Sequence, residues 1–311
     1  MITDTAPAAG SPDFELIACN LCGSRASRVL FERPYPRLET LKEDARMTTD
    51  VFGNYGRIVR CLGCNLVFIN PRPRIAAICD SYAQMEDADY CREQECRSIN
   101  AHIALRLIKR HATGGKLLDI GCSTGFLLNA ARLDFDTHGV EPSSWAAAHT
   151  SRRLGLNVTE GFFRDGMFPA QSFDVVTMCD VIEHVGDPKG DLAAIHKILK
   201  PGGVFYLVTP NIRSLSARLL GSYWWGLRPA HLTYFSDVTM RKMLTDAGFD
   251  VVEMRSFGRI FTLDYWLGRL RNYPRPVSWI VDKFIALFGV RDKIFYINTR
   301  DSMELVAVKK G

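Results

Sequence analysis

The sequence predicts an α/β protein built on a mainly parallel sheet with helices on both faces, preceded by a small metal-binding region. Three observations support this fold class. From Lys116 onward, apolar strand-like segments alternate with helical segments, which is the pattern of a parallel sheet. The first of these strands, 117–120, runs directly into a turn of small residues at 121–125 and then into a helical pattern. Two Cys-x-x-Cys pairs precede this alternating part of the chain.

The composition is that of a globular protein, with 47% apolar and 23% charged residues in a chain of 311. This length accommodates one large domain with a small one, or two of medium size. The net charge of +5 is mildly basic and falls short of what a nucleic-acid-binding domain would show. Charged residues interrupt the apolar stretch 279–290, so we expect no transmembrane segment. The first residues lack the features of a signal peptide, and we predict a disordered tail over 1–13.

The nine cysteines are odd in number and some fall inside predicted strands, which disfavours a disulfide framework and favours a reducing cytoplasm. Two Cys-x-x-Cys pairs can supply four thiolates to one tetrahedral zinc ion. Strand-like segments flank both pairs, as in a zinc ribbon, which we predict to span 14–73. A redox role for the pairs is the alternative. Because four thiolates leave no open coordination position, the zinc would be structural. The predicted ligands are Cys19, Cys22, Cys61 and Cys64.

A helical connector is predicted over 74–112, where apolar residues recur at helical spacing. Its cysteines lack metal-site spacing and are interpreted as plain thiols. The sequence Thr-Gly-Gly at 113–115 then breaks the helix and begins the main domain, predicted to span 113–311. Within that domain, 257–300 is long for a plain connection. We predict two amphipathic helices there, forming a lid or a homodimer face, with peripheral membrane attachment as the alternative. The connector cysteines are Cys79, Cys91 and Cys96.

The turn that follows the first strand of the main domain suits a nucleotide-like cofactor. Small residues at 121–125 would let backbone N–H groups and the start of the next helix face a ligand. The spacing is neither that of a Gly-x-Gly-x-x-Gly turn nor that of a P-loop. Glu141, 22 residues after Asp119, follows the second strand, where a carboxylate can accept from both ribose hydroxyls. An acid at such a place is also an ordinary helix-start residue.

The spacing Asp-x-Gly-x-Ser-x-Gly over 119–125 resembles motif I of class I S-adenosylmethionine (SAM) methyltransferases. Ser123 stands where that family usually has a third glycine. Two later motifs follow in the family's order: Asp-Val-Ile-Glu-His-Val at 180–185 and Leu-Lys-Pro-Gly-Gly at 199–203. Over about 117–209 the chain therefore resembles the ubiquinone-biosynthesis-type branch of these enzymes. The resemblance implies a seven-stranded Rossmann-like sheet whose last strand is antiparallel.

The resemblance also implies where SAM would bind. The turn at 121–125 would hold the methionine end, Glu141 the ribose, and the loop after the third strand the adenine. For the phenylalanine and the acid of that loop, the alternative is a core aromatic beside a solvated side chain. Cys122 is interpreted as a small turn residue and not as a nucleophile. The implied cofactor-binding residues are Asp119, Gly121, Cys122, Ser123, Gly125, Glu141, Pro142, Phe163, Asp165 and Asp180.

Two histidines are candidates for the catalytic acid/base that a hydroxyl acceptor requires. His231 lies in an aromatic segment, and similar segments occur at this place in relatives that act on sugars and on lipid or polysaccharide precursors. His184 follows Asp180 and Glu183 at the edge of the sheet. Asp180, Glu183 and His184 could instead hold a divalent cation, or Glu183 and His184 could serve capping and packing alone. Aromatic residues near His231 suit a sugar face, an aromatic ring or core packing equally: Tyr223, Trp224, Trp225, Tyr234 and Phe235.

The leading functional hypothesis is a cytoplasmic SAM-dependent methyltransferase acting on a small or carrier-linked acceptor. A sugar in a nucleotide-sugar, polysaccharide, glycolipid or natural-product pathway is the preferred acceptor. One alternative is an rRNA or tRNA methyltransferase that uses the zinc ribbon to bind RNA, although the ribbon arginines are scattered among acids. The other alternative is a non-catalytic SAM-binding or zinc-ribbon interaction protein, which the intact Asp119 and Glu141 disfavour.

Overall fold

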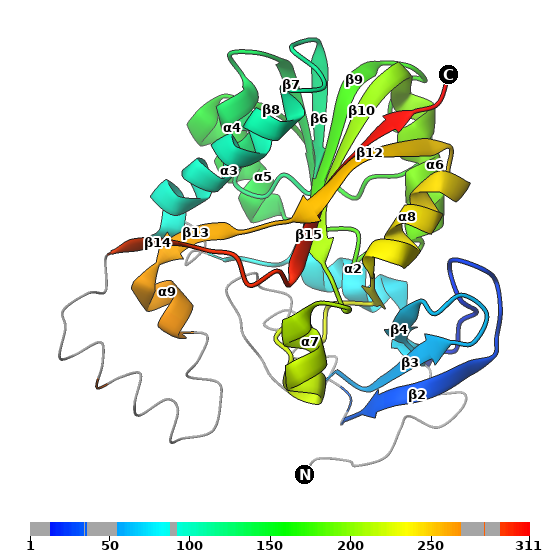
Figure 1. Cartoon of the computed structure of the whole chain (residues 1–311). Coiled ribbons are helices and arrows are strands. Elements are labelled where there is room, and N and C mark those ends of the chain that lie inside the picture. Colours follow the sequence, from blue (N-terminus) through cyan, green and yellow to red (C-terminus); the bar gives the residue numbers. More distant parts are fainter. Residues whose placement is uncertain (1–12, 34, 36–54, 88–91, 269–282, 284–292) are drawn as a thin grey trace.

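The computed structural model describes residues 13–33, 35, 55–87, 92–268, 283 and 293–311 (Figure 1). Three sequence predictions therefore lie outside the described residues, wholly or in large part. They are the N-terminal tail, Cys91 and the apolar stretch 279–290.

A seven-stranded sheet forms the centre of the main domain, in the order β12-β15-β10-β9-β6-β7-β8 (Figure 1). The neighbouring strands from β10 to β8 in this order pair in parallel. The last strand, β15, is antiparallel to both of its neighbours. The predicted seven-stranded sheet with an antiparallel last strand is therefore confirmed. Its strands are β6 (Lys116–Ile120), β7 (Asp136–Glu141), β8 (Asn157–Glu160), β9 (Phe173–Cys179), β10 (Leu199–Pro210), β12 (Phe249–Ser256) and β15 (Ser302–Lys309).

Helices cover both faces of this sheet because its strands are apolar on both sides. Side chains alternate along a strand, so Leu117 and Leu118 of β6 point to opposite faces. Leu117 packs in a cluster with residues of α3 and α4, whereas Leu118 packs in a cluster with residues of α6 and α8. Figure 1 shows α3 and α4 on one side of the sheet and α6 and α8 on the other. The helices are α3 (Gln94–Ile108), α4 (Phe126–Ala131), α5 (Ser144–Leu154), α6 (Pro188–Ile198) and α8 (Asp237–Asp246).

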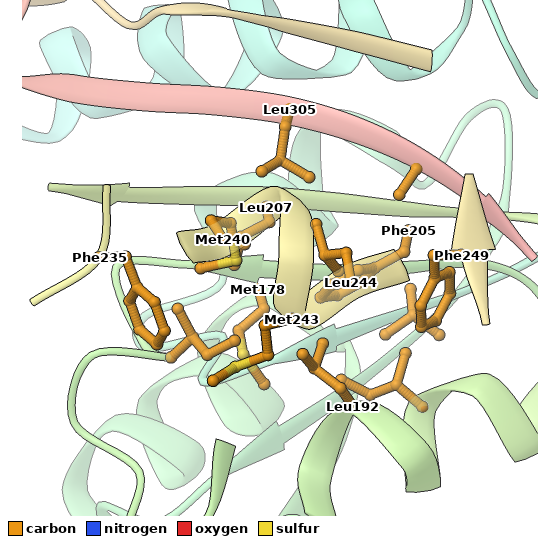
Figure 2. Packing of buried hydrophobic residues seen from close by; sticks show 14 of the residues in the cluster. Met178, Leu192, Phe205, Leu207, Phe235, Met240, Met243, Leu244, Phe249 and Leu305 are labelled. Atoms are coloured by element: carbon orange, nitrogen blue, oxygen red, sulfur yellow. The ribbon is translucent and has the colours of Figure 1, made fainter. Parts of the chain in front are cut away.

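The cluster beneath α8 is the more extensive of the two (Figure 2). Met240, Met243 and Leu244 of α8 are at most 1% exposed and pack over the apolar face of β10. Ser236 caps the N-terminus of α8, since its hydroxyl accepts a hydrogen bond from the N–H of Thr239. This packing fixes the segment that precedes α8, which carries His231.

The cysteine pairs lie beside a second, smaller sheet with the strand order β11-β4-β3-β2. Strands β2, β3 and β4 come from the predicted ribbon, but β11 comes from the C-terminal half of the chain. Ribbon residues including Cys61, Leu66 and Phe68 belong to the same apolar cluster as α8, so the ribbon packs directly on the main domain. The strands are β2 (Ser27–Glu32), β3 (Arg57–Cys61), β4 (Val67–Ile69) and β11 (Thr233–Tyr234); β1 (Phe14–Glu15) pairs separately with β5 (Arg72–Pro73), and α2 (Ile75–Ala83) follows.

The region 257–300 is described only at its two ends and at residue 283, so the second of the two predicted helices, over 279–290, lies outside the described residues almost entirely. Its described residues include a two-stranded sheet and a short helix, α9. At its start, Phe261 lies in a strand and pairs with Phe295, whereas Tyr265 and Trp266 lie in α9. Among the described residues, no helix combines the length and the apolar character needed to cross a bilayer. The remaining elements are α7 (Leu215–Leu220), a 3-10 turn (Gly221–Tyr223), β13 (Arg259–Thr262), α9 (Leu263–Gly268) and β14 (Ile294–Ile297).

Candidate functional site

A cavity of about 740 Å³ lies at the C-terminal edge of the parallel strands. Ligands of open α/β sheets bind at this edge, because the loops that follow the strands surround it. The walls of the cavity include the ends of β6, β7, β9 and β10 and parts of α2, α3 and α9. Both candidate catalytic histidines line it. Of the implied cofactor-binding residues, the lining includes Asp119, Gly121, Cys122, Ser123, Glu141, Pro142, Phe163 and Asp180.

The turn after β6 bends back on itself in a conformation that only small residues tolerate. Gly121 has a φ of 72°, and a Cβ at this position would lie 2.5 Å from Cγ2 of Val181. Gly125 has a φ of 79° and closely approaches Thr150 of α5. Ser123 adopts a φ of 48°, in the left-handed region that glycine occupies most easily. Its carbonyl accepts a hydrogen bond of 2.8 Å from the Thr150 hydroxyl, which helps to hold this strained residue in place.

Glu141 ends β7 with its carboxylate turned toward that turn. One carboxylate oxygen accepts the backbone N–H of Ser123 at 2.7 Å, and the other accepts the N–H of Ser143 at 2.9 Å. The side chain is buried, and desolvation raises its pKa to about 7. A carboxylate has about four lone-pair sites, so two hydrogen bonds leave acceptor capacity for a ligand.

Asp119 lies just before the turn and Cys122 lies within it, and both are buried. The Asp119 carboxylate accepts a hydrogen bond of 2.6 Å from the Thr177 hydroxyl, and burial raises its pKa to about 7. Burial also raises the pKa of the Cys122 thiol well above its usual value. The thiol packs where a Cβ at Gly139 would lie. A protonated, packed thiol is a poor nucleophile, which agrees with the interpretation of Cys122 as a turn residue.

The loop after β8 places its two predicted adenine contacts differently. Phe163 lines the cavity, beside Phe162. Asp165 lies outside the cavity lining and pairs instead with Lys197, whose ammonium is 3.0 Å from a carboxylate oxygen. This ion pair lowers the pKa of Asp165. The structure therefore does not bring Asp165 to the cofactor side of the cavity.

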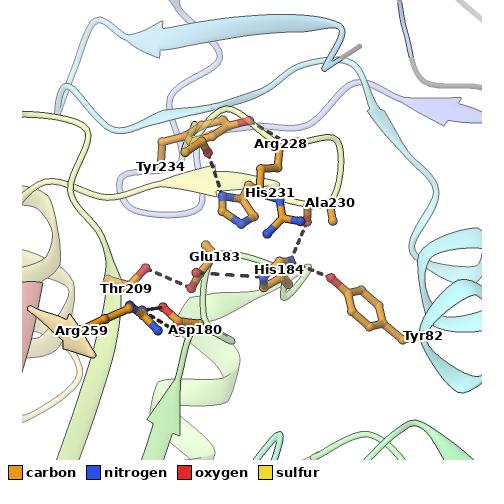
Figure 3. Close-up of polar contacts among 11 residues, drawn as sticks. Tyr82, Asp180, Glu183, His184, Thr209, Arg228, Ala230, His231, Tyr234 and Arg259 are labelled. Atoms are coloured by element: carbon orange, nitrogen blue, oxygen red, sulfur yellow. Dashed lines mark hydrogen bonds and ion pairs between the residues drawn. The ribbon is translucent and has the colours of Figure 1, made fainter. Parts of the chain in front are cut away.

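Glu183, His184 and His231 lie close together (Figure 3), and all three line the cavity. One potential ligand atom from each of the three lies within 4.8 Å of the others. The His231 Nδ1–H donates to the carbonyl of Gly226 at 2.8 Å, so Nε2 carries the lone pair. The Nδ1 of His184 lies 2.6 Å from the Tyr82 hydroxyl. Sequence reasoning missed Tyr82, because α2 gives no sign that it reaches this edge of the sheet.

Burial is the main cause of the pKa shifts in this cluster. It lowers the pKa of His184 to about 4 and that of His231 well below its usual value, so both imidazoles are neutral at pH 7. Desolvation raises the pKa of Glu183 to about 8. The Thr209 hydroxyl donates to one oxygen of Glu183, whereas the other oxygen is buried and has no hydrogen-bond partner among the described residues. That oxygen can bind a polar group of a ligand.

Asp180 lies apart from this cluster because it is held by another residue. Both of its oxygens accept hydrogen bonds from Nη2 of Arg259, at 2.7 and 2.6 Å. The predicted cation set of Asp180, Glu183 and His184 is therefore not brought together, since the Arg259 guanidinium neutralises Asp180. His231 takes the third place in the cluster instead. Arg259 was missed because its segment was expected to be helical.

The four predicted cysteine ligands converge at one point in the ribbon. Their sulfur atoms lie within 4.8 Å of one another, with Cys19–Cys64 and Cys22–Cys61 Sγ–Sγ distances of 3.4 Å. Zn–S bonds of about 2.3 Å in a tetrahedron give sulfur separations of roughly 3.8 Å, so the set fits one zinc ion with little adjustment. Burial would raise the pKa of Cys61, but nearby backbone N–H groups outweigh it and lower that pKa to about 7.

The aromatic residues around His231 divide between packing and the cavity. Trp224, Tyr234 and Phe235 are at most 3% exposed and belong to the apolar clusters. Trp225 lines the cavity, and its indole N–H donates to Asp301. Core packing therefore accounts for most of this set, and Trp225 is its member at the site.

Comparison with known proteins gives the same picture of the main domain. A family model described as a methyltransferase domain matches residues 91–254. A ubiquinone biosynthesis O-methyltransferase of Cereibacter sphaeroides is 28% identical over 180 residues, covering 54% of this chain and 72% of that protein. One of Methylococcus capsulatus is 35% identical over 137 residues, covering 40% of this chain and 57% of that protein. The ribbon lies before the matched region of the family model.

Solved structures share this fold even where their sequence identity to this chain is low. The complex of the Haloferax volcanii Trm112 methyltransferase activator with a methyltransferase described as putative contains a chain with a TM-score of 0.52. It is 21% identical, and the alignment covers 71% of this chain and 94% of that one. At this identity the likeness concerns the fold alone.

Proposed function

Because this chain belongs to the methyltransferase-domain family and is a SAM-dependent methyltransferase, we propose that its cavity is divided between a cofactor half and an acceptor half. The turn at 121–125 and Glu141 belong to the cofactor half. Glu183, His184 and His231 belong to the acceptor half. The observation that carries this division is that one continuous cavity is lined by both groups of residues.

The residues of the cofactor half fit SAM. The turn at 121–125 forms a backbone cradle in which a Cβ at Gly121 would collide with Val181, so glycine suits this position. Glu141 faces this cradle with acceptor capacity to spare, which suits the two hydroxyls of a ribose. Phe163 supplies an apolar wall for the adenine. Bound SAM supplies an electrophilic methyl group, so the protein has only to hold the acceptor in line and manage a proton.

In the acceptor half, His231 is the proposed proton acceptor. Its Nδ1–H is committed to the Gly226 carbonyl, and its low pKa keeps Nε2 unprotonated at neutral pH. A correctly placed base raises the rate by roughly 10²–10⁴-fold. Positioning of the reactants lowers the activation free energy by about 7–11 kcal/mol. His184 packs edge-to-face on His231, with ring centroids 4.6 Å apart, and so holds its ring in place.

We further propose that the acceptor is a hydroxyl on an aromatic ring. The names of the two relatives above support an O-methylated acceptor. The aromatic lining near β13 and α9, which includes Phe261, Tyr265 and Trp266, offers surfaces against which such a ring can stack. The sugar acceptor expected from the sequence gains no support from these relatives. A carrier-linked acceptor is compatible with the size of the cavity.

A two-stage experiment tests this function. Calorimetry first measures SAM binding to the zinc-loaded protein, and mass spectrometry then follows methylation of matched panels of phenols, catechols and sugar nucleotides. We expect saturable SAM binding and methylation of a ring hydroxyl. Methylation confined to sugars would overturn the acceptor class, and absence of SAM binding would overturn the assignment of the cofactor half.

A further inference from the structure

The cysteine cluster lies one strand away from the proposed base. Cys61 ends β3 and Cys64 lies in the turn that leads into β4, so this Cys-x-x-Cys pair is the β3–β4 turn itself. The N–H of Cys61 donates to the carbonyl of Leu66 at 2.9 Å and closes that turn. A metal bound to the thiolates would therefore set where β4 begins.

From β4 the connection passes directly to the segment that follows His231. Thr233 pairs with Phe68, and the N–H of Ile69 donates to the carbonyl of Leu232 at 3.0 Å. On its other side, this segment is held by Glu183. The N–H groups of Leu232 and Thr233 both donate to the Glu183 carbonyl, at 2.8 and 3.1 Å. The backbone next to His231 is thus fixed between the ribbon and the acceptor half of the cavity.

A second connection reaches the same part of the site from the other Cys-x-x-Cys pair. Asn20, between Cys19 and Cys22, donates its side-chain N–H to the carbonyl of Gly186 at 3.3 Å. Arg72, at the end of the ribbon, donates to the same carbonyl at 2.6 Å. Gly186 lies two residues after His184, so both ends of the ribbon hold the loop that carries the acceptor-side cluster.

The cofactor half has its own supports. Asp119 is held by Thr177, and Glu141 by backbone N–H groups of the turn and of α5. These contacts lie within the main sheet and its turns, and none of their partners is a ribbon residue. Loss of the ribbon metal should therefore act on the two halves of the cavity unequally.

We infer that the metal-loaded cysteine cluster is a positioning element for methyl transfer: it fixes His231 and the Glu183–Gly186 loop through β4, while SAM binding is independent of it. The inference rests on the proposed role of His231. It assigns the ribbon to the acceptor step and not to cofactor binding.

The test compares the zinc-loaded protein with the metal-stripped protein and with Cys22→Ser. Leu62→Ser is the matched control, since Leu62 lies in a metal-binding turn but is 61% exposed. Substitution of Co²⁺ for zinc reports through its thiolate absorption whether four sulfurs bind one ion. The readouts are SAM affinity, hydrogen exchange at Ile69 and Leu232, and the imidazole NMR signals of His231 and of the exposed His102.

We expect metal loss to speed exchange at Ile69 and Leu232 by at least tenfold and to shift the His231 signals, but not those of His102. The SAM affinity of the metal-stripped protein should stay within threefold of that of the zinc-loaded protein. With an identified acceptor, the rate of methyl transfer should fall by at least tenfold. Unchanged His231 signals would overturn the inference while leaving the methyltransferase intact. Loss of SAM binding together with the fold would also overturn it, because the metal would then stabilise the whole protein. Absence of SAM binding in the zinc-loaded protein would instead refute the proposed function.

Discussion

The carboxylate of Glu141 serves the fold and the proposed ligand at once. It fixes the N–H of Ser123, a residue in the left-handed region, and that of Ser143 at the start of α5. A substitution that removes the carboxylate therefore loosens the cradle as well as removing a ribose acceptor.

The first prediction concerns that carboxylate. Glu141→Gln should weaken SAM binding about tenfold to a hundredfold, since a hydrogen bond to a charged group contributes about 1.5–3 kcal/mol. Calorimetry measures the affinity, and circular dichroism checks that the fold persists. The control is Glu160→Gln, because Glu160 ends the neighbouring strand β8 and is exposed. Equal affinity of Glu141→Gln and the wild type would remove Glu141 from the ribose site.

A pH dependence follows from the same group. The folded pKa of Glu141 is about 7, above its usual 4.5, so the folded protein binds more protons than the unfolded chain between these values. Stability contributed by this group therefore falls as pH rises from 4.5 to 7. SAM binding requires the ionised form and should strengthen over this interval, by up to about tenfold per pH unit below 7. Asp119, with a pKa of about 7, acts in the same direction.

Titrations of SAM affinity at about pH 5.5, 6.5 and 8 would check this expectation, with two points below the folded pKa of Glu141 and one above it. Glu141→Gln should flatten the profile. A profile that weakens with rising pH would contradict the assigned role.

His231 carries the third prediction. His231→Asn should lower kcat by about 10²–10⁴-fold, the usual contribution of a general base, while SAM affinity changes less than twofold. Asparagine keeps a donor for the Gly226 carbonyl. His102→Asn, on the exposed side of α3, is the control. If kcat is unchanged, another group removes the proton, and His184 becomes the remaining candidate.

At the scale of elements, the ion pair between Asp180 and Arg259 joins the end of β9 to β13. The two side chains are 32% and 26% exposed, so the pair is partly buried. Removing one partner leaves a partly desolvated charge, which should cost about 1–3 kcal/mol of unfolding free energy, less than for a fully buried pair. The pair also anchors the hairpin of β13 and β14, whose strand β13 and following helix α9 line the acceptor half.

Arg259→Met should therefore destabilise the protein by this amount and raise the KM of the acceptor more than the Kd of SAM. Thermal unfolding and steady-state kinetics measure the two effects. Lys242→Met breaks the exposed pair with Asp246 on α8 and should change stability by less than about 0.5 kcal/mol. Equal effects on acceptor and SAM would argue against β13 as a wall of the acceptor half.

The elements of the main sheet could be predicted because each one is local. Apolar strands such as 117–120, the small-residue turn at 121–125 and the cap at Ser236 all carry their signals within a few residues. The region 257–300 could not be predicted in the same way. Whether Phe261 lies in a helix or a strand depends on β14, some 30 residues later along the chain, which pairs with it. Periodicity over a short apolar run does not separate these cases.

At the scale of the whole molecule, the sequence predicts the site's contents better than its arrangement. The four cysteines and the acids at the ends of β6 and β7 follow from spacing. Tyr82 and Arg259 line the cavity from elements that lie outside the sequence motifs. No local sequence pattern indicates that these two residues belong to the site. Asp165 matches the expected loop, yet Lys197 on α6 holds it away from the cavity. Which side chains from distant elements contact one another depends on how those elements pack. A single sequence does not reveal that packing.

Ribbon arginines illustrate the same point for the alternative of RNA binding. Arg57 pairs with Glu32 and Arg72 with Glu15, so part of the basic character of the ribbon is neutralised within the ribbon itself. Exposed surface charge, and not composition, decides nucleic-acid affinity.

The pairing of β4 with β11 also constrains the order in which the chain can fold. Residues 67–69 emerge early in synthesis, but their partner strand at 233–234 follows after most of the main domain. Until then, the open edge of β4 and the side chains of Leu66 and Phe68 have no cover. A nascent chain would carry an unfinished ribbon through most of its translation. Truncations that separate the ribbon from the main domain should consequently aggregate more readily than the full chain.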